Sequence, residues 1–178
     1  MNITVYLGAS LGNDVSYQQQ IRALGVWLAQ QHHQLIYGGS KNGLMGILAD
    51  TVLENGGNVY GIIPEFFQKQ EAAHQGLTHL QTVSDIDERK RLLMEKGDIL
   101  LAFPGGPGTL EEISQAISWA RMKQHTKPCL FFNMNGYYNH LKAHFDQMTE
   151  AGFLTKHDRD NIIFVDTLQE LADFIDND

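Results

Sequence analysis

The architecture of this chain follows from one run of residues, Leu101-Ala102-Phe103-Pro104-Gly105-Gly106-Pro107-Gly108-Thr109-Leu110-Glu111-Glu112. The run begins inside residues 99–103, where five apolar side chains in succession predict a buried β-strand. Three glycines and two prolines fill residues 104–108, and a helix is expected from there to about Arg121. A strand that leads through a glycine-rich turn into a helix is typical of the βα units of parallel sheets.

The same alternation of strand and helix continues on both sides of this run. Further strands are predicted at residues 3–7, 35–37, 59–63, 129–132 and 162–165, with a short one within 77–83 of an otherwise irregular segment, 65–84. Helices are predicted around Ile21, Leu24 and Leu28, and at 44–53, 85–96, 138–150 and 168–175. Repeated βα units predict an α/β fold, an open parallel sheet covered by helices on both faces.

Length and composition predict one globular domain over residues 1–178, because 43% of the residues are hydrophobic and 19% are charged. The net charge of −8 argues against nucleic acid as a partner, since phosphates would repel the chain. The single cysteine, Cys129, excludes an intrachain disulfide and fits a reducing, cytoplasmic location. We expect no membrane attachment, because no apolar stretch approaches the roughly 20 residues of a spanning helix and the first residues do not resemble a secretory signal.

The glycine-rich turn at Pro104 to Thr109 predicts a phosphate-binding cradle. Glycines let backbone N–H groups approach a ligand closely, and a helix start carries partial positive charge. The spacing matches neither the Walker A loop nor the dinucleotide fingerprint. A tight βα turn is the alternative, but it requires fewer glycines and prolines. Thr109 and Glu112 also match a capping box, in which Glu112 would bend back onto the helix start instead of facing a ligand.

Two more loops follow predicted strands and should meet the first one, because ligands bind at the carboxyl ends of strands in such sheets. One contains Gly8 and Ser10; the other contains Gly38, Gly39, Gly43 and Met45. Met45 is a candidate for the pocket wall, with core packing as the alternative.

A third group of candidate residues begins the helix at 85–96. Arg89 and Lys90 could reach an anionic ligand from there, although a run of charges more often forms a solvated face. The histidine pair His140 and His144 is spaced for a shared helix face but lacks a third ligand, so no metal site is expected.

Taken together, these residues resemble the Lonely Guy (LOG) family of cytokinin riboside 5'-monophosphate phosphoribohydrolases, long labelled lysine decarboxylases. The family signature Pro-Gly-Gly-x-Gly-Thr-x-x-Glu is found at residues 104–112, the Arg-Lys pair at 89–90 and a Gly-Gly-x-x-x-Gly-Leu-Met-Gly segment at 38–46. The resemblance implies a Rossmann-like fold, a homodimer with active sites near the subunit interface, and hydrolysis of the bond between a purine base and ribose 5-phosphate. No cofactor is expected.

The resemblance also assigns roles to residues. It implies that Arg89 and Glu112 are the catalytic pair. With the loop residues above, the expected substrate-binding set is Gly8, Ser10, Gly38, Gly39, Gly43, Met45, Glu71, Lys90, Pro104, Gly105, Gly106, Pro107, Gly108, Thr109, Leu110, Glu111 and Ser118. Pro107 stands where many members have Tyr, which bears on the preferred base.

Glycosidic cleavage passes through an oxocarbenium-like state, which a carboxylate stabilises. We expect Glu112 to remain ionised, because the helix start favours its anion. Arg89 would assist departure of the base or hold the ribose and phosphate. A non-catalytic nucleotide sensor or carrier of the same superfamily is the alternative function, and a DNA-processing protein of related fold is a weaker one because the chain lacks a basic stripe.

Overall fold

The structure is a computed structural model and describes residues 1–69 and 72–177. Glu71, one of the expected substrate-binding residues, lies outside this described part. The strands are β1 (Asn2–Tyr6), β2 (Gln34–Tyr37), β3 (Val59–Pro64), β4 (His79–Val83), β5 (Ile99–Ala102), β6 (Cys129–Phe132) and β7 (Ile162–Val165). The helices are α1 (Val15–Gln30), α2 (Gly43–Glu54), α3 (Glu65–Lys69), α4 (Ile86–Lys96), α5 (Pro107–Arg121), α6 (Asn139–Glu150), α7 (Lys156–Asp160) and α8 (Leu168–Asn177), with a 3-10 turn η1 (Met134–Gly136).

All seven strands join one parallel sheet in the order β4-β3-β2-β1-β5-β6-β7. The chain builds outward from β1 to one edge through β4 and then returns to add β5 on the other side of β1. Strand order therefore reverses between β1 and β5, where Ile3 pairs with Ile99 and Tyr6 with Ala102. The loops after these two strands diverge, which opens a crevice at their carboxyl ends.

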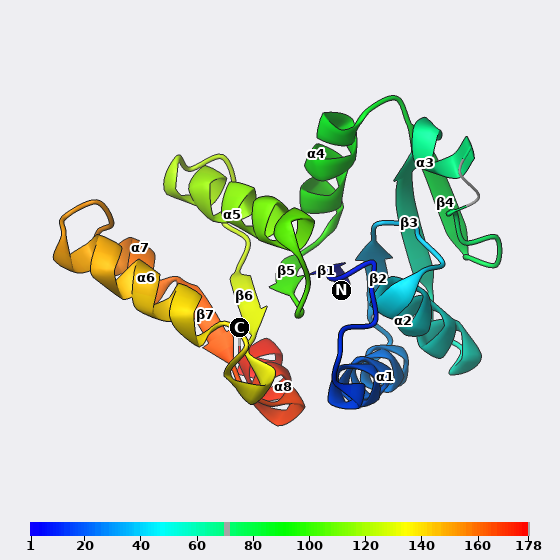
Figure 1. Ribbon diagram of the computed structural model, residues 1–178, viewed down its shortest axis with the longest axis horizontal. Helices are drawn as coiled ribbons and strands as arrows, with labels where there is room; N and C mark the ends of the chain where they lie inside the picture. Colours follow the sequence, from blue (N-terminus) through cyan, green and yellow to red (C-terminus); the bar gives the residue numbers. More distant parts are fainter. Residues whose placement is uncertain (70–71, 178) are drawn as a thin grey trace.

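Helices cover both faces of the sheet, as Figure 1 shows. Helices α1, α2 and α8 bury apolar side chains against one face, and α4, α5 and α6 bury theirs against the other. Strand β5, beside the central strand β1, is buried along its whole length because both of its faces are covered. On α1, the periodic residues Ile21, Leu24 and Leu28 are fully buried.

The predicted parallel α/β sheet is confirmed, and the predicted strands agree with the observed ones to within two residues. The short strand expected within residues 77–83 is β4. The sequence analysis missed α3 and α7, since five-residue helices are too short to display a hydrophobic period. No helix in the described ranges has the length and apolar character needed to cross a bilayer.

Candidate active site

A cavity of about 570 Å³ lies at the carboxyl ends of β1 and β5. Its wall combines the loop after β1, the glycine-rich turn after β5, and side chains from α1, α2, α4 and α5. The lining residues are Leu7, Gly8, Ala9, Ser10, Gly12, Asn13, Tyr17, Leu44, Met45, Arg89, Pro104, Gly105, Gly106, Gly108, Thr109, Glu112 and Tyr137. The cavity therefore lies at the strand-order reversal, where a parallel α/β sheet binds its ligands.

The glycine-rich turn forms the start of α5, and it does so without a capping box. Gly106 is the N-cap residue and Pro107 the first helical residue, so Thr109 already lies inside the helix. The capping-box alternative is therefore wrong: the helix begins three residues earlier than that pattern requires. Proline suits the first helical position because its missing N–H would have no helical acceptor there. Thr109 is buried, and its hydroxyl packs against Gly105 so closely that a Cβ at position 105 would overlap it.

Gly106 and Gly108 have no neighbours that would exclude a larger side chain. A Cβ built on either residue meets no atom within 4 Å, and neither has a positive φ. Both residues line the cavity. Within the described part of the chain, the backbone N–H groups of Gly106, Gly108 and Thr109 have no protein acceptor, as expected for the first turn of a helix. The bare backbone at these positions leaves room for an anion to approach those N–H groups.

Arg89 and Glu112 form a buried ion pair at the base of the cavity. The Arg89 Nη1 atom donates to Glu112 Oε1 at 3.0 Å, and Arg89 Nε donates to the carbonyl of Ile62 at 3.2 Å. Each residue is only 9% exposed. Because two hydrogen bonds hold the guanidinium, its orientation toward Glu112 is fixed. The second carboxylate oxygen, Glu112 Oε2, has no hydrogen-bond partner among the described residues.

The loop after β2 makes room for this pair. A Cβ at Gly38 would overlap the Arg89 guanidinium, and the sulfur of Met45 lies close to the same point. Gly43 has a φ of +57° and packs against the backbone of Ala9, which a side chain would prevent. These contacts join the β2 loop to both the β1 loop and the ion pair.

Burial raises the pKa of the Glu112 carboxyl above its ordinary value of 4.5, against the lowering effect of the Arg89 guanidinium. That Glu112 remains ionised stays a prediction, but the helix start contributes little to it, because α5 begins at Pro107 and Glu112 is its sixth residue. The desolvation of a carboxylate that is almost fully buried outweighs the lowering effect of the nearby Arg89 guanidinium.

Comparisons with known proteins identify the family of this chain. The model of a family described as "Possible lysine decarboxylase" matches residues 45–175. A cytokinin riboside 5'-monophosphate phosphoribohydrolase of Rhodococcoides fascians is 41% identical over 163 residues, which are 91% of this chain and 82% of that protein. This chain belongs to the LOG family.

A second LOG family member, the cytokinin riboside 5'-monophosphate phosphoribohydrolase LOG1 of Arabidopsis thaliana, is 36% identical over 170 residues, 96% of this chain and 80% of that protein. Among solved structures, the molybdenum cofactor carrier protein of Chlamydomonas reinhardtii aligns with a TM-score of 0.73 and 17% identity, covering 99% of this chain and 96% of that chain. Identity this low shows a shared fold and nothing more.

The structure brings together most of the site residues expected for this LOG family chain. Arg89 and Glu112 line the cavity, with Gly8, Ser10, Met45, Pro104, Gly105, Gly106, Gly108 and Thr109. The glycines at 38, 39 and 43 do not line the cavity; their lack of side chains allows close contacts in the loop after β2. Pro107, Leu110, Glu111 and Ser118 are exposed on α5 and face away from the cavity of their own chain.

Lys90 lies beside these exposed residues of α5. Its ammonium group contacts Asp87 Oδ1 and Glu111 Oε1, each at 2.9 Å. Helices α4 and α5 of this LOG family chain are thus tied twice, by the buried Arg89–Glu112 pair and by the outer Lys90–Glu111 pair.

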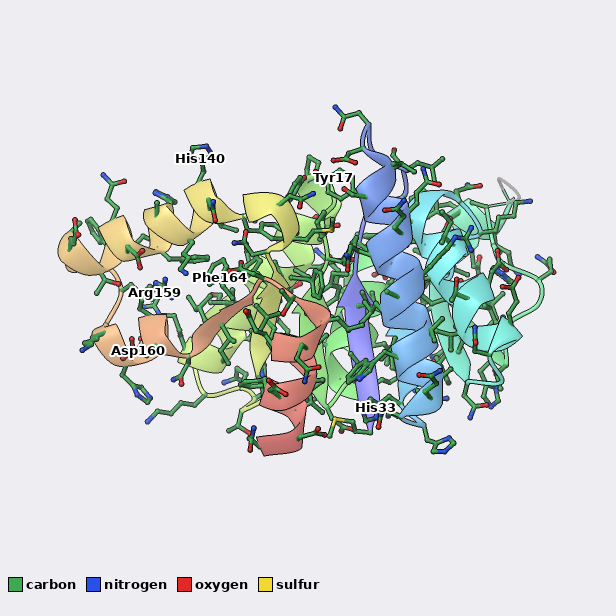
Figure 2. All side chains as sticks on the ribbon, turned by 90° about the horizontal axis from the view of Figure 1, so that it is seen from below. Tyr17, His33, His140, Arg159, Asp160 and Phe164 are labelled. Carbon is green, nitrogen blue, oxygen red and sulfur yellow. The ribbon has the colours of Figure 1, made fainter. Side chains whose placement is uncertain are left out.

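Seven cavity residues were not among the expected site residues: Leu7, Ala9, Gly12, Asn13, Tyr17, Leu44 and Tyr137. Tyr137 follows β6, so the rule that sites form at the carboxyl ends of strands could have found it. Asn13 and Tyr17 lie beyond the short β1 loop and carried no motif. Within the described residues, no group of three or more His, Cys, Asp or Glu side chains is placed to hold a metal ion. His140 points away from the molecule in Figure 2.

Proposed function

We propose that this protein hydrolyses the N-glycosidic bond of a purine nucleoside 5'-monophosphate, with AMP or an N6-modified adenine nucleotide as substrate. The products are the free base and ribose 5-phosphate. The observation that carries the proposal is the placement of the buried Arg89–Glu112 pair next to the open N–H groups of the glycine-rich turn, in the wall of one cavity. The names of its LOG family relatives support the same reaction.

The glycine-rich turn would hold the 5'-phosphate at the start of α5, where partial positive charge favours an anion. Binding energy from the phosphate would then orient the sugar over Glu112. As the bond between C1' and the base breaks, its electron pair leaves with the base and positive charge develops on the sugar. Glu112, with Oε2 free to act on the ligand, would stabilise that charge or take the proton of the attacking water. Arg89 fixes the Glu112 carboxyl and adds positive charge near the leaving base.

A nucleotide carrier without turnover is the competing function. Such a protein needs the anion cradle but has no use for a buried carboxylate and guanidinium in the same wall, because burying this pair is costly. The decarboxylase named in the family description is disfavoured for another reason. Its chemistry requires a lysine that forms a Schiff base, and no lysine lines the described cavity.

We also propose that residues 1–178 act as one unit and that two copies form a homodimer through α4 and α5. Supporting this, the expected substrate-binding residues Lys90, Glu111 and Ser118 lie on an outer face of these helices, away from their own cavity. On a dimer they would face the cavity of the second copy. The buried free thiol of Cys129 fits a cytoplasmic protein, and the net charge of −8 fits a small-molecule substrate better than nucleic acid.

The test is direct. The purified protein is incubated with AMP or isopentenyladenosine monophosphate, and free base and ribose 5-phosphate are separated by chromatography. The dephosphorylated nucleosides serve as controls. Release of base from a monophosphate but not from its nucleoside is expected. Binding of either nucleotide without any release of base would instead support the carrier function.

A further inference from the structure

The segment between β6 and α6, residues 133–138, packs against the glycine-rich turn through two consecutive tyrosines. The hydroxyl of Tyr138 donates to the carbonyl of Phe103 at 2.9 Å, inside the protein. The hydroxyl of Tyr137 donates to the carbonyl of Gly105 at 2.6 Å. The carbonyls of Phe103 and Gly105, the residues on either side of Pro104, are thus hydrogen-bonded by side chains that follow β6 and lie outside the signature motif.

This segment is itself firmly held. The Asn133 side chain accepts a hydrogen bond from the Tyr138 backbone N–H at 2.7 Å and donates to Asn139 Oδ1 at 2.9 Å and Asp166 Oδ1 at 2.8 Å. Asn133 is 5% exposed, so these bonds are protected from water. The tyrosines therefore come from a fixed turn rather than from a freely moving loop.

The ring of Tyr137 is held between two other rings. It meets Tyr138 edge to face at 4.9 Å between centroids, and Tyr17 at 6.0 Å with an interplanar angle of 84°. Figure 2 labels Tyr17 at the amino end of α1, on the side toward the segment that enters α6. Tyr17 and Tyr137 both line the cavity. This aromatic packing orients Tyr137 independently of its hydroxyl.

We propose that Tyr137 is a positioning residue of the phosphate cradle. In a trans peptide the carbonyl and the following N–H point in opposite directions, so a bond to the Gly105 carbonyl also sets the direction of the Gly106 N–H. Neighbouring glycines offer little resistance to rotation of this peptide. Without the Tyr137 hydroxyl, the Gly105 oxygen is free to turn toward the cavity, where it would repel an anion. The inference rests on the proposed function for the nature of its ligand, a sugar 5'-phosphate.

The test compares Tyr137→Phe with the wild type and with Tyr60→Phe. Phenylalanine keeps the ring packing and removes only the hydroxyl. Tyr60 is a matched control, because its hydroxyl also makes one hydrogen bond, 2.8 Å to Gln81 Oε1, on the far side of β3 from the cavity. Affinities for ribose 5-phosphate, AMP and adenosine are measured by titration calorimetry. Thermal unfolding of each variant is recorded alongside.

We expect Tyr137→Phe to bind ribose 5-phosphate and AMP about 5–10-fold more weakly, the effect of about 1 kcal/mol for one lost hydrogen bond. The affinity for adenosine should stay within about twofold of wild type, since adenosine has no phosphate and does not use the cradle that this hydrogen bond positions. Tyr60→Phe should bind all three ligands like the wild type.

Unchanged affinity of Tyr137→Phe for ribose 5-phosphate would overturn the inference, as would an equal loss for adenosine, which indicates general damage. The proposed hydrolysis is tested separately by the release of base. A wild type that binds ribose 5-phosphate but releases no base would contradict the hydrolase while leaving the positioning role measurable. A wild type that binds no ribose 5-phosphate would overturn the positioning role, whereas the hydrolase would still be judged by the release of base.

Discussion

Opposing effects act on the pKa of the Glu112 carboxyl. Burial to 9% exposure favours the neutral acid and raises the pKa of this carboxyl, although the Arg89 guanidinium favours the anion. Such a perturbed carboxyl next to a fixed cation is common at catalytic centres. A purely structural role remains the competing interpretation, and mutation separates the two.

Glu112→Gln should keep the fold and lose turnover by roughly 100-fold or more, the usual effect of removing a charged group from a transition state. Glutamine keeps the size of the side chain and an oxygen for Arg89 but carries no charge. Glu95→Gln is the control, because Glu95 pairs with Arg91 on the exposed side of α4. The measurement is kcat for AMP cleavage, with circular dichroism for the fold. Near-normal turnover of Glu112→Gln would rule out the catalytic role.

The raised pKa of Glu112 also predicts a pH dependence of stability. The folded state binds this proton more tightly than the unfolded chain, so the wild type loses stability relative to Glu112→Gln as the pH rises from about 4.5 through the folded pKa. Below 4.5 the difference should be constant. Urea unfolding of both proteins between pH 4 and 8 measures it. A difference that grows in favour of the wild type with rising pH would mean that Arg89 lowers this pKa below its ordinary value.

The first turn of α5 contains a residue that lowers the stability of the helix and leaves room for a ligand. Its second helical residue is Gly108, and glycine weakens a helix without any gain in packing here, since a Cβ would meet no atom within 4 Å. Glycine at this position therefore lowers the stability of the helix and leaves the N–H groups of its first turn accessible. The pair Arg89–Glu112 then ties this helix to α4, so the cradle and the carboxyl move as one body.

Gly108→Ala should leave the protein equally stable or stabilise it by about 0.5–1 kcal/mol, because alanine is the better helix former. The same methyl group should raise the KM for AMP about tenfold or more by crowding the cradle. Gln147→Ala, at an exposed position of α6 that does not line the cavity, is the control for helix propensity. Both are compared by thermal unfolding and by steady-state kinetics. Unchanged KM in Gly108→Ala would mean that the phosphate binds elsewhere.

At the scale of the whole molecule, the outer face of α4 and α5 is the face through which we propose that two copies of the chain associate. Leu110 is 42% exposed there and Ile86 37%, next to the charged pair Lys90–Glu111. Apolar side chains rimmed by charges are typical of a protein interface. A dimer through this face would bring the two sites close to each other.

Light scattering should therefore give twice the chain mass of 20.0 kDa for the wild type. Leu110→Asp places a charge in the proposed interface and should yield monomers with at least about tenfold lower activity, since a buried unpaired charge is strongly unfavourable. Phe153→Asp is the control: Phe153 is 80% exposed in the turn after α6 and should leave the dimer intact. A dimeric, active Leu110→Asp would place the interface elsewhere.

Local signals, namely apolar periodicity and glycine spacing, were enough to predict the parallel α/β class, the strands to within two residues at their ends, and the glycine-rich turn. The partnership of Arg89 with Glu112 was implied only by family resemblance. The contacts between distant segments could be seen only in the folded chain. They are the space that Gly38 leaves for Arg89, the burial that shifts the pKa of Glu112, and the hydrogen bond from Tyr137 to the Gly105 carbonyl. Such contacts depend on strand order, which places segments far apart in the chain side by side. Strand order cannot be read from a local sequence pattern.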